Sequence, residues 1–128
     1  MVRRFLALPL LAALFALLAP HTAQAASGGG CRNTYDVGAC VSYSSTYKRV
    51  SADFYLNSNN RGSCTAKLYI RVNGTWHYKY TAFLDHYGRY PEGHVSVSGS
   101  GTAYSEVDLY DCSGNYQYSA RSPSLYYP

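Results

Sequence analysis

Residues 64–84, CTAKLYIRVNGTWHYKYTAFL, contain two runs of alternating apolar and polar side chains on either side of Asn73-Gly74. Strict alternation places every second side chain on the same face of the chain and is typical of a half-buried β-strand. Asn-Gly between two such runs is a strong signal for a β-hairpin. We therefore expect a hairpin here, and the rest of the fold is read outward from it.

The length of the hairpin loop decides which face carries the aromatic side chains. A two-residue loop at Asn73-Gly74 pairs Arg71 with Trp76 and exposes a stripe of cations and aromatic rings. A three-residue loop that includes Val72 pairs Ile70 with Trp76 and places the rings on the buried face, because a slip of one residue exchanges the two faces. Asn-Gly favours the first loop and burial favours the second. We expect the three-residue loop, with the other as the alternative.

Alternating patterns predict further strands on both sides of the hairpin, and no helical periodicity follows residue 30. The expected strands outside the hairpin cover residues 41–47, 50–57, 94–98, 103–112, 116–120 and 125–127. Short strands at regular spacing, separated by Gly, Asn, Ser and Pro, are typical of a sandwich or small barrel. We expect an all-β fold, a single antiparallel β-sandwich of about seven short strands over residues 31–128.

The first 25 residues have the pattern of a secretory signal peptide. Arg3 and Arg4 precede an apolar run at residues 5–19, and Ala23-Gln24-Ala25 is a cleavage site of small residues. At about 1.5 Å per residue the run is too short to span a bilayer as a helix, so we expect cleavage and secretion rather than membrane attachment. Residues 26–30 have few side chains that can pack, and we expect a flexible arm there.

Four cysteines follow the signal peptide: Cys31, Cys40, Cys64 and Cys112. An even number of cysteines in an exported chain indicates two disulfides, for which three pairings exist. We favour Cys31–Cys40, which closes a short loop, together with Cys64–Cys112, which joins two expected strands. No CxxC pair occurs, so a zinc site is not expected.

Charge and motifs exclude several classes of function. Only 14% of the residues are charged. After removal of the signal peptide the chain has nine basic and seven acidic side chains, and the basic ones are scattered along the sequence. Nucleic-acid binding needs a dense basic patch and is not expected. Asp85-His86 is the nearest approach to a base and its orienting acid, but no nucleophile elbow, metalloprotease or phosphate-loop motif accompanies it. We expect no catalytic residues, no metal site and no cofactor.

The 15 tyrosines are the most unusual feature of the composition. A domain of this size cannot bury so many phenols, and loops rich in Tyr, Ser, Gly and Asn are typical of protein-binding surfaces. The candidate partner-binding residues are Arg32, Tyr35, Asp36, Tyr87 and Tyr90. We expect the partner to be another secreted protein. The alternative partner is a polysaccharide, which the two-residue turn would favour because it exposes Trp76, Tyr78 and Tyr80 in a row.

Two resemblances bear on these expectations. The order Cys64, Trp76, Tyr110, Cys112 resembles the Cys…Trp…Tyr-x-Cys pattern of immunoglobulin domains, which implies a sandwich. The whole chain, a signal peptide followed by a Tyr-rich β-domain with four cysteines, resembles small secreted proteins of filamentous actinomycetes in its overall organisation. These include tendamistat-type amylase inhibitors, protease inhibitors and adaptor subunits of umbrella toxin particles. The inhibitors' Trp-Arg-Tyr triplet is replaced by Trp76-His77-Tyr78.

The second resemblance implies a non-catalytic docking or adaptor subunit of a secreted complex, and an antibacterial toxin complex in particular. The alternative functions are inhibition of a secreted hydrolase and carbohydrate binding of the lectin type. The resemblance transfers no site residues, because no specific motif accompanies it.

Overall fold

The computed structural model describes residues 25–128, so nearly all of the expected signal peptide lies outside the described residues. The described part contains ten β-strands and no helix that is long and apolar enough to cross a membrane. The strands are β1 (Ser27–Gly28), β2 (Gly30–Thr34), β3 (Val37–Ser44), β4 (Arg49–Leu56), β5 (Thr65–Val72), β6 (Thr75–Phe83), β7 (Gly88–Ser96), β8 (Gly101–Tyr110), β9 (Tyr116–Arg121) and β10 (Leu125–Tyr127).

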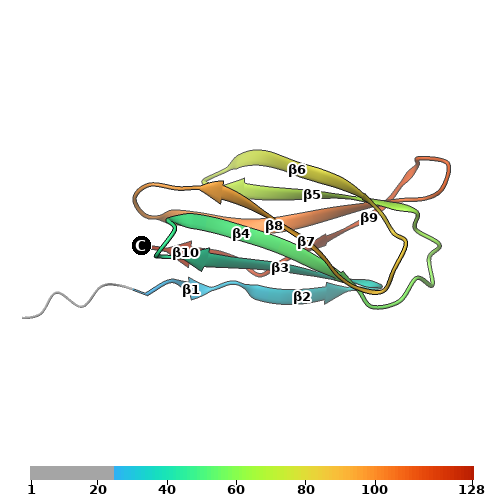
Figure 1. The fold of residues 1–128 in the computed structure, drawn as a ribbon, viewed down its shortest axis with the longest axis horizontal. Coiled ribbons are helices and arrows are strands. Elements are labelled where there is room, and N and C mark those ends of the chain that lie inside the picture. Colours follow the sequence, from blue (N-terminus) through green and yellow to red (C-terminus); the bar gives the residue numbers. More distant parts are fainter. Residues whose placement is uncertain (1–24) are drawn as a thin grey trace, which may run out of the picture.

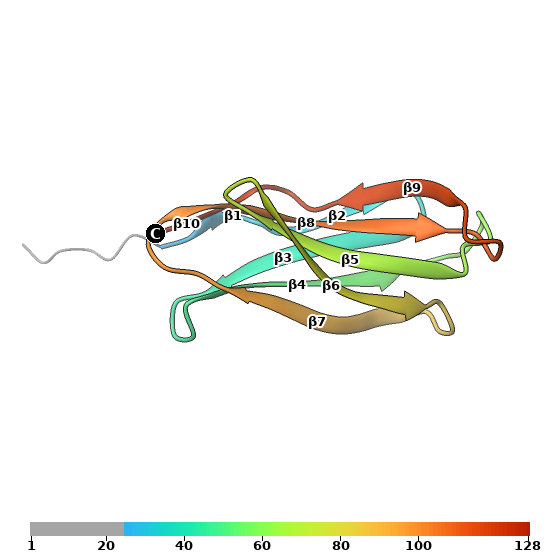
Figure 2. The same ribbon diagram turned by 90° about the horizontal axis from the view of Figure 1, so that it is seen from above.

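Two antiparallel sheets pack face to face as a sandwich (Figure 1, Figure 2). One sheet has the order β2-β3-β4-β7. The other has six strands in the order β1-β10-β8-β5-β6, with β9 also paired to β8. β10 pairs with residues 101–103 of β8 and β9 with residues 106–110, and Pro123 lies in the short connection between β9 and β10. The expected sandwich is confirmed, with ten short strands rather than about seven.

Alternate side chains of the central strands meet between the sheets and form the core. The inward-facing residues of β4 and β5 are Val50, Ala52, Phe54, Leu56, Ala66, Leu68, Ile70 and Val72. All of them are buried, and the burial of one large aliphatic or aromatic side chain contributes about 1.5–3 kcal/mol. The alternation in the sequence therefore predicted the core positions of these two strands correctly.

The β5–β6 turn differs from the loop that we expected. Val72 pairs with Thr75, so the loop has two residues, and Asn73 and Gly74 both have positive φ angles, 48° and 83°. This is the pattern of the type I′ turn that Asn-Gly favours. The preference for a three-residue loop was therefore wrong, and Trp76 is 42% exposed on the outer face of the sheet.

A β-bulge in β6 explains how a two-residue turn is compatible with burial of the aromatic side chains later in this strand. Tyr69 pairs with Tyr78, but Leu68 pairs with Tyr80, so Lys79 is an extra residue in β6. A bulge returns the following residues to the opposite face. Tyr80, Ala82 and Leu84 therefore pack toward the core although Tyr78 points outward. β6 can therefore follow a two-residue turn and still place Tyr80 against the core.

The two disulfides join the cysteines as we expected, Cys31 to Cys40 and Cys64 to Cys112. Cys31 and Cys40 lie directly opposite each other on β2 and β3. Cys64 precedes β5 and Cys112 follows β8, and these two strands are neighbours. Disulfides of this kind are typical of oxidising compartments.

The N-terminal segment at residues 26–30, which we expect to be a flexible arm, makes backbone contacts with the C-terminal strand. Ser27 and Gly28 pair with β10, and the amide of Gly29 donates a 2.8 Å hydrogen bond to the carbonyl of Ser124. Residues 28–30 all have positive φ angles, a conformation that glycine adopts without strain. These glycines lead the chain from the six-stranded sheet into β2 of the four-stranded sheet (Figure 1).

The immunoglobulin-like pattern correctly implied a sandwich, but it did not predict the position of Trp76. Trp76 lies on the outer face, whereas the pattern implies a buried ring against the disulfide. β8 ends at Tyr110, so Cys112 lies beyond the strand and its position does not force Glu106 and Asp108 inward. Both acids point outward, because Ser105, Val107 and Leu109 are the buried residues of this strand.

Candidate functional site

The outer face of the six-stranded sheet carries a continuous group of aromatic and charged side chains. They come from the outward positions of β5, β6 and β8, three strands that pair side by side. We call this group the aromatic face, and its members are Tyr69, Arg71, Trp76, Tyr78, Tyr104, Glu106 and Asp108. Because it is built on paired strands rather than on loops, it is held rigidly.

The rings of the aromatic face meet edge to face around Trp76. Its ring centre lies 6.1 Å from that of Tyr69 and 5.7 Å from that of Tyr104, with interplanar angles of 79° and 87°. Tyr69 also meets Tyr78 at 5.7 Å and 62°. These separations and angles are typical of favourable aromatic pairs. The rings stand at steep angles to one another, so they do not form a flat platform.

Two arginines connect the rings. The guanidinium of Arg71 lies 5.0 Å from the centre of the Trp76 ring and donates a 3.0 Å hydrogen bond to the Tyr104 hydroxyl. The guanidinium of Arg121 lies 4.6 Å from the centre of the Tyr104 ring and donates a 2.9 Å hydrogen bond to Glu106. These contacts hold the exposed rings in place, which lowers the entropy that a partner must remove on binding.

A groove of about 420 Å³ opens on the aromatic face, lined by Tyr69, Trp76, Glu106 and Asp108. Asp108 accepts a 2.6 Å hydrogen bond from the Ser119 hydroxyl of β9. Partial burial raises the pKa of Asp108 above its ordinary value, although the Ser119 hydrogen bond opposes this. The ionised carboxylate is therefore less stable here than it is in water.

The loops at one end of the sandwich form a second candidate surface. The β2–β3, β4–β5, β6–β7 and β8–β9 connections lie together at this end, and the β5–β6 turn lies at the other (Figure 1). Tyr35 occupies the β2–β3 turn with a φ of 51° and is 65% exposed. Its ring meets Tyr118 edge to face at 5.3 Å, and the guanidinium of Arg61 covers it at 3.5 Å.

Asp36, a candidate partner-binding residue, is buried beneath this surface and supports it. The residue is 2% exposed, and its carboxylate accepts hydrogen bonds from the Ser58 hydroxyl at 2.5 Å and the Arg61 amide at 3.2 Å. Burial acts to raise the pKa of Asp36, but these hydrogen bonds and that of the Asn60 amide outweigh it and lower the pKa. Asp36 thereby holds the β4–β5 loop, which presents Arg61 to Tyr35.

The β6–β7 connection also combines an exposed residue, Tyr87, with a buried residue that supports it, Tyr90. Tyr87 is 69% exposed, as a binding residue must be. Tyr90 is buried, with its ring stacked between Phe54 and His86 at 4.7 and 4.1 Å. Its hydroxyl donates a 2.8 Å hydrogen bond to the His86 carbonyl. Tyr90, a candidate partner-binding residue, therefore anchors the loop, and its ring is buried in the free domain. Arg32 is exposed on the edge strand β2.

His86 has the geometry of a structural residue rather than of a general base. Its Nδ1 lies 2.7 Å from the Asp85 carboxylate and its Nε2 lies 3.1 Å from the Arg89 carbonyl oxygen. Both partners are hydrogen-bond acceptors, so these contacts favour the doubly protonated ring, which donates from both nitrogens. The Asp85 hydrogen bond, followed by that to the Arg89 carbonyl, raises the pKa of His86. The described residues contain no group of three or more side chains that could hold a metal ion.

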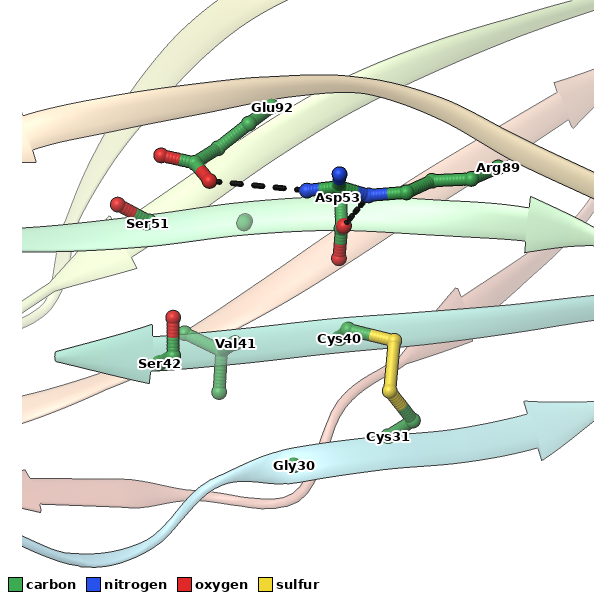
Figure 3. Close-up of a pocket in the computed structure, with 10 residues that line it drawn as sticks. Gly30, Cys31, Cys40, Val41, Ser42, Ser51, Asp53, Arg89 and Glu92 are labelled. Carbon is green, nitrogen blue, oxygen red and sulfur yellow. Dashed lines mark hydrogen bonds and ion pairs between the residues drawn. A yellow bond between two sulfur atoms is a disulfide. The ribbon is translucent and has the colours of Figure 1, made fainter.

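The outer face of the four-stranded sheet differs from the aromatic face. Figure 3 shows a hollow there beside the Cys31–Cys40 disulfide, with Asp53, Arg89 and Glu92 above it. Arg89 is hydrogen-bonded to Asp53 and its Nη2 lies 3.7 Å from Glu92. Arg49 also lies 3.7 Å from Glu92, so two arginines balance the two carboxylates beside this hollow.

No protein-family model, curated protein or solved structure matches this chain.

Sequence reasoning found Tyr35 and Tyr87 but missed most of the aromatic face. The two-residue turn would have placed Arg71 beside Trp76, and the alternation in β8 already separated Glu106 and Asp108 from the core residues. Combining these two signals would have placed the acids and the rings on one face. The pairing of β5 with β8, between which 28 residues intervene, carries no local signal.

Proposed function

We propose that the chain is a secreted, non-catalytic protein-binding module that acts as a docking or adaptor subunit of a secreted complex. The observation that carries the proposal is Trp76, which is exposed on a rigid sheet and held in position by Tyr69, Tyr104 and Arg71. Trp, Tyr and Arg are the residue types that contribute most of the binding energy in protein interfaces.

An adaptor needs two separate binding surfaces, and two separate exposed aromatic surfaces on the domain support this function. Trp76 lies next to the β5–β6 turn at one end of the sandwich, whereas Tyr35 and Tyr87 belong to the loops at the other end (Figure 1). Each surface has an exposed aromatic side chain with ordered support. Two partners could therefore bind without competing, which favours an adaptor over a module with a single partner.

Inhibition of a secreted hydrolase is the second candidate. Tyr35 is displayed at the tip of a hairpin that the Cys31–Cys40 disulfide closes. A short, covalently closed hairpin loses little conformational entropy when it enters a cleft, which suits an inhibitor. This candidate uses only the loop end and leaves the aromatic face without a role.

Carbohydrate binding is the third candidate, and the exposure of Trp76 and Tyr78 favours it. Sugar rings stack on exposed aromatic faces, ideally on several that lie in one plane. The steep angles between Trp76 and its neighbours, and the guanidinium of Arg71 over its ring, favour a protein partner instead.

Affinity capture from the producing culture tests the proposal. The wild-type domain should retain a secreted protein at fixed stoichiometry. Trp76→Ala should weaken that interaction by at least about thirtyfold, the cost of losing a central interface residue. Tyr55→Ala, on the outer face of the four-stranded sheet, is the matched control and should bind as the wild type does. Retention on insoluble polysaccharide with no protein bound would support the carbohydrate function, and a captured hydrolase that loses activity would support inhibition.

A further inference from the structure

The four residues that line the groove on the aromatic face share one chemical property. Tyr69 and Trp76 present aromatic rings, and Glu106 and Asp108 present carboxylates. Both kinds of group attract cations. We propose that this groove receives the side chain of a lysine or arginine from the protein partner, an inference that rests on the proposed function.

The charge balance within the groove leaves room for an added cation. Glu106 is paired with Arg121 at 2.9 Å. Among the described residues no ion pair within 4.0 Å reaches Asp108, although it lies opposite Lys67 in the sheet. The Lys67 ammonium is instead 4.9 Å from the centre of the Tyr110 ring. One carboxylate of the groove therefore lacks a direct cationic partner.

The position of the Asp108 carboxylate is fixed by a chain of hydroxyl groups. Ser119 donates its proton to Asp108 at 2.6 Å, so the 2.7 Å contact between Ser119 and Tyr116 must use the Tyr116 proton. This arrangement holds the carboxylate in one orientation before any ligand arrives. Partial burial raises the pKa of Asp108, and a bound cation would remove that cost.

The two rings provide walls at nearly a right angle. The planes of Tyr69 and Trp76 meet at 79° with their centres 6.1 Å apart, so one cation in the corner can lie within about 6 Å of both. The same chemistry already operates nearby, where Arg71 lies over the Trp76 ring and Arg121 over the Tyr104 ring. A lysine or arginine from a partner would add one more cation to this series.

Trp76 is the only tryptophan of the chain, so its fluorescence reports directly on the groove. The test titrates the intact domain with acetyl-Gly-Arg-Gly-amide and with the isosteric neutral peptide acetyl-Gly-citrulline-Gly-amide. We expect saturable quenching by the arginine peptide and at least about fivefold weaker binding of the citrulline peptide. The corresponding lysine peptide should also bind. Equal responses to the charged and the neutral peptide would overturn the proposal.

Asp108→Asn is the decisive variant and Asp53→Asn is its matched control. Both change the net charge by the same amount, but Asp53 lies on the opposite sheet and is bonded to Arg89. Asp108→Asn should weaken the arginine peptide about five- to tenfold, and Asp53→Asn should not. An unchanged affinity of Asp108→Asn, with the wild-type circular dichroism spectrum, would refute the inference. If that variant binds normally while Trp76→Ala still loses the captured protein, the proposed function stands and only the cation site fails.

Discussion

The guanidinium carbon of Arg61 lies 3.5 Å from the centre of the Tyr35 ring, although the two residues are 26 positions apart in the chain. The β2–β3 turn presents the ring and the β4–β5 loop presents the cation. Asp36 joins the two segments by accepting the amide hydrogen bond of Arg61. An exposed tyrosine at the tip of a hairpin is thus held in one orientation.

Tyr35→Ala should weaken partner binding by about 1–3 kcal/mol, the range for an aromatic residue that becomes buried in an interface. The side chain is mostly exposed, so its removal should lower the free energy of unfolding by less than about 1 kcal/mol. Calorimetric titration against the captured partner measures the first effect and thermal melting the second. If Tyr35→Ala binds as tightly as the wild type, Tyr87 becomes the residue of the loop end to test.

Loss of the Cys64–Cys112 disulfide should cost more stability than loss of Cys31–Cys40. The two bridges separate 48 and 9 residue positions, so they restrict the unfolded chain to different extents. Loop-closure entropy predicts contributions of about 4.1 and about 2.7 kcal/mol. Urea unfolding of Cys64→Ser and Cys31→Ser compares them, and the intact domain should be four hydrogens lighter than its reduced form. A peptide map that links Cys31 to Cys112 would contradict the pairing.

Gly74→Ala should destabilise the domain by about 1–2 kcal/mol, because Gly74 has a φ of 83° that alanine adopts only with strain. Gly74→Asn is the control and should cost less, since asparagine tolerates this conformation. The hairpin turn also orients Trp76, so its fluorescence maximum should shift toward that of free tryptophan in Gly74→Ala. Equal unfolding midpoints for the two variants would contradict the prediction that the positive φ angle of Gly74 causes the loss of stability.

The Asp85–His86 pair should stabilise the fold over a limited range of pH. The hydrogen bonds of His86 raise its pKa, so its contribution is present below the ordinary value of 6.5 and is lost as the pH rises through the raised pKa. The hydrogen bond to His86 lowers the pKa of Asp85, whose contribution is lost as the pH falls through that lowered pKa. The difference in Tm between wild type and His86→Ala should therefore be largest in mildly acid solution and shrink toward pH 9. Partner binding at fixed pH should survive this change, since both ring nitrogens bind within the chain.

Asp108→Asn should stabilise the domain near neutral pH even though it weakens binding of a cation. Burial raises the pKa of Asp108, so the folded state disfavours the ionised carboxylate, and this cost disappears as the pH falls through the raised pKa. Tm measurements should show the variant above the wild type at pH 7 and level with it at pH 3. A lower Tm of the variant at pH 7 would mean that the Ser119 hydrogen bond outweighs the burial.

The sequence predicted what depends on local periodicity and on turn chemistry. Alternation located the strands around Leu68 and Phe54, and loop length favoured the observed cysteine pairs. The Asn73-Gly74 signal for a two-residue turn was also correct, but we gave burial more weight. The bulge at Lys79 has no signature in the sequence, and it reconciles the turn with the core.

The candidate site was predicted only in part, because support and display depend on tertiary contacts. Tyr35 and Tyr87 are exposed, whereas Asp36 and Tyr90 are buried, and each pair comes from a similar polar, aromatic loop. The local sequence does not predict that Asp36 accepts a hydrogen bond from Ser58 or that Tyr90 stacks on Phe54. Such contacts arise when distant strands are brought together.

The pairing of β1 with β10 determines how the domain responds when it is held by its ends. Ser27 lies beside Tyr126, so chains attached before β1 and after β10 leave the sandwich at the same end (Figure 1). A domain tethered through either terminus therefore points the Tyr35 and Tyr87 loops away from its attachment. Tension between the two ends would break the hydrogen bonds between β1 and β10 one after another, beginning at the chain termini. Mechanical failure should therefore begin at this edge while the interior remains packed.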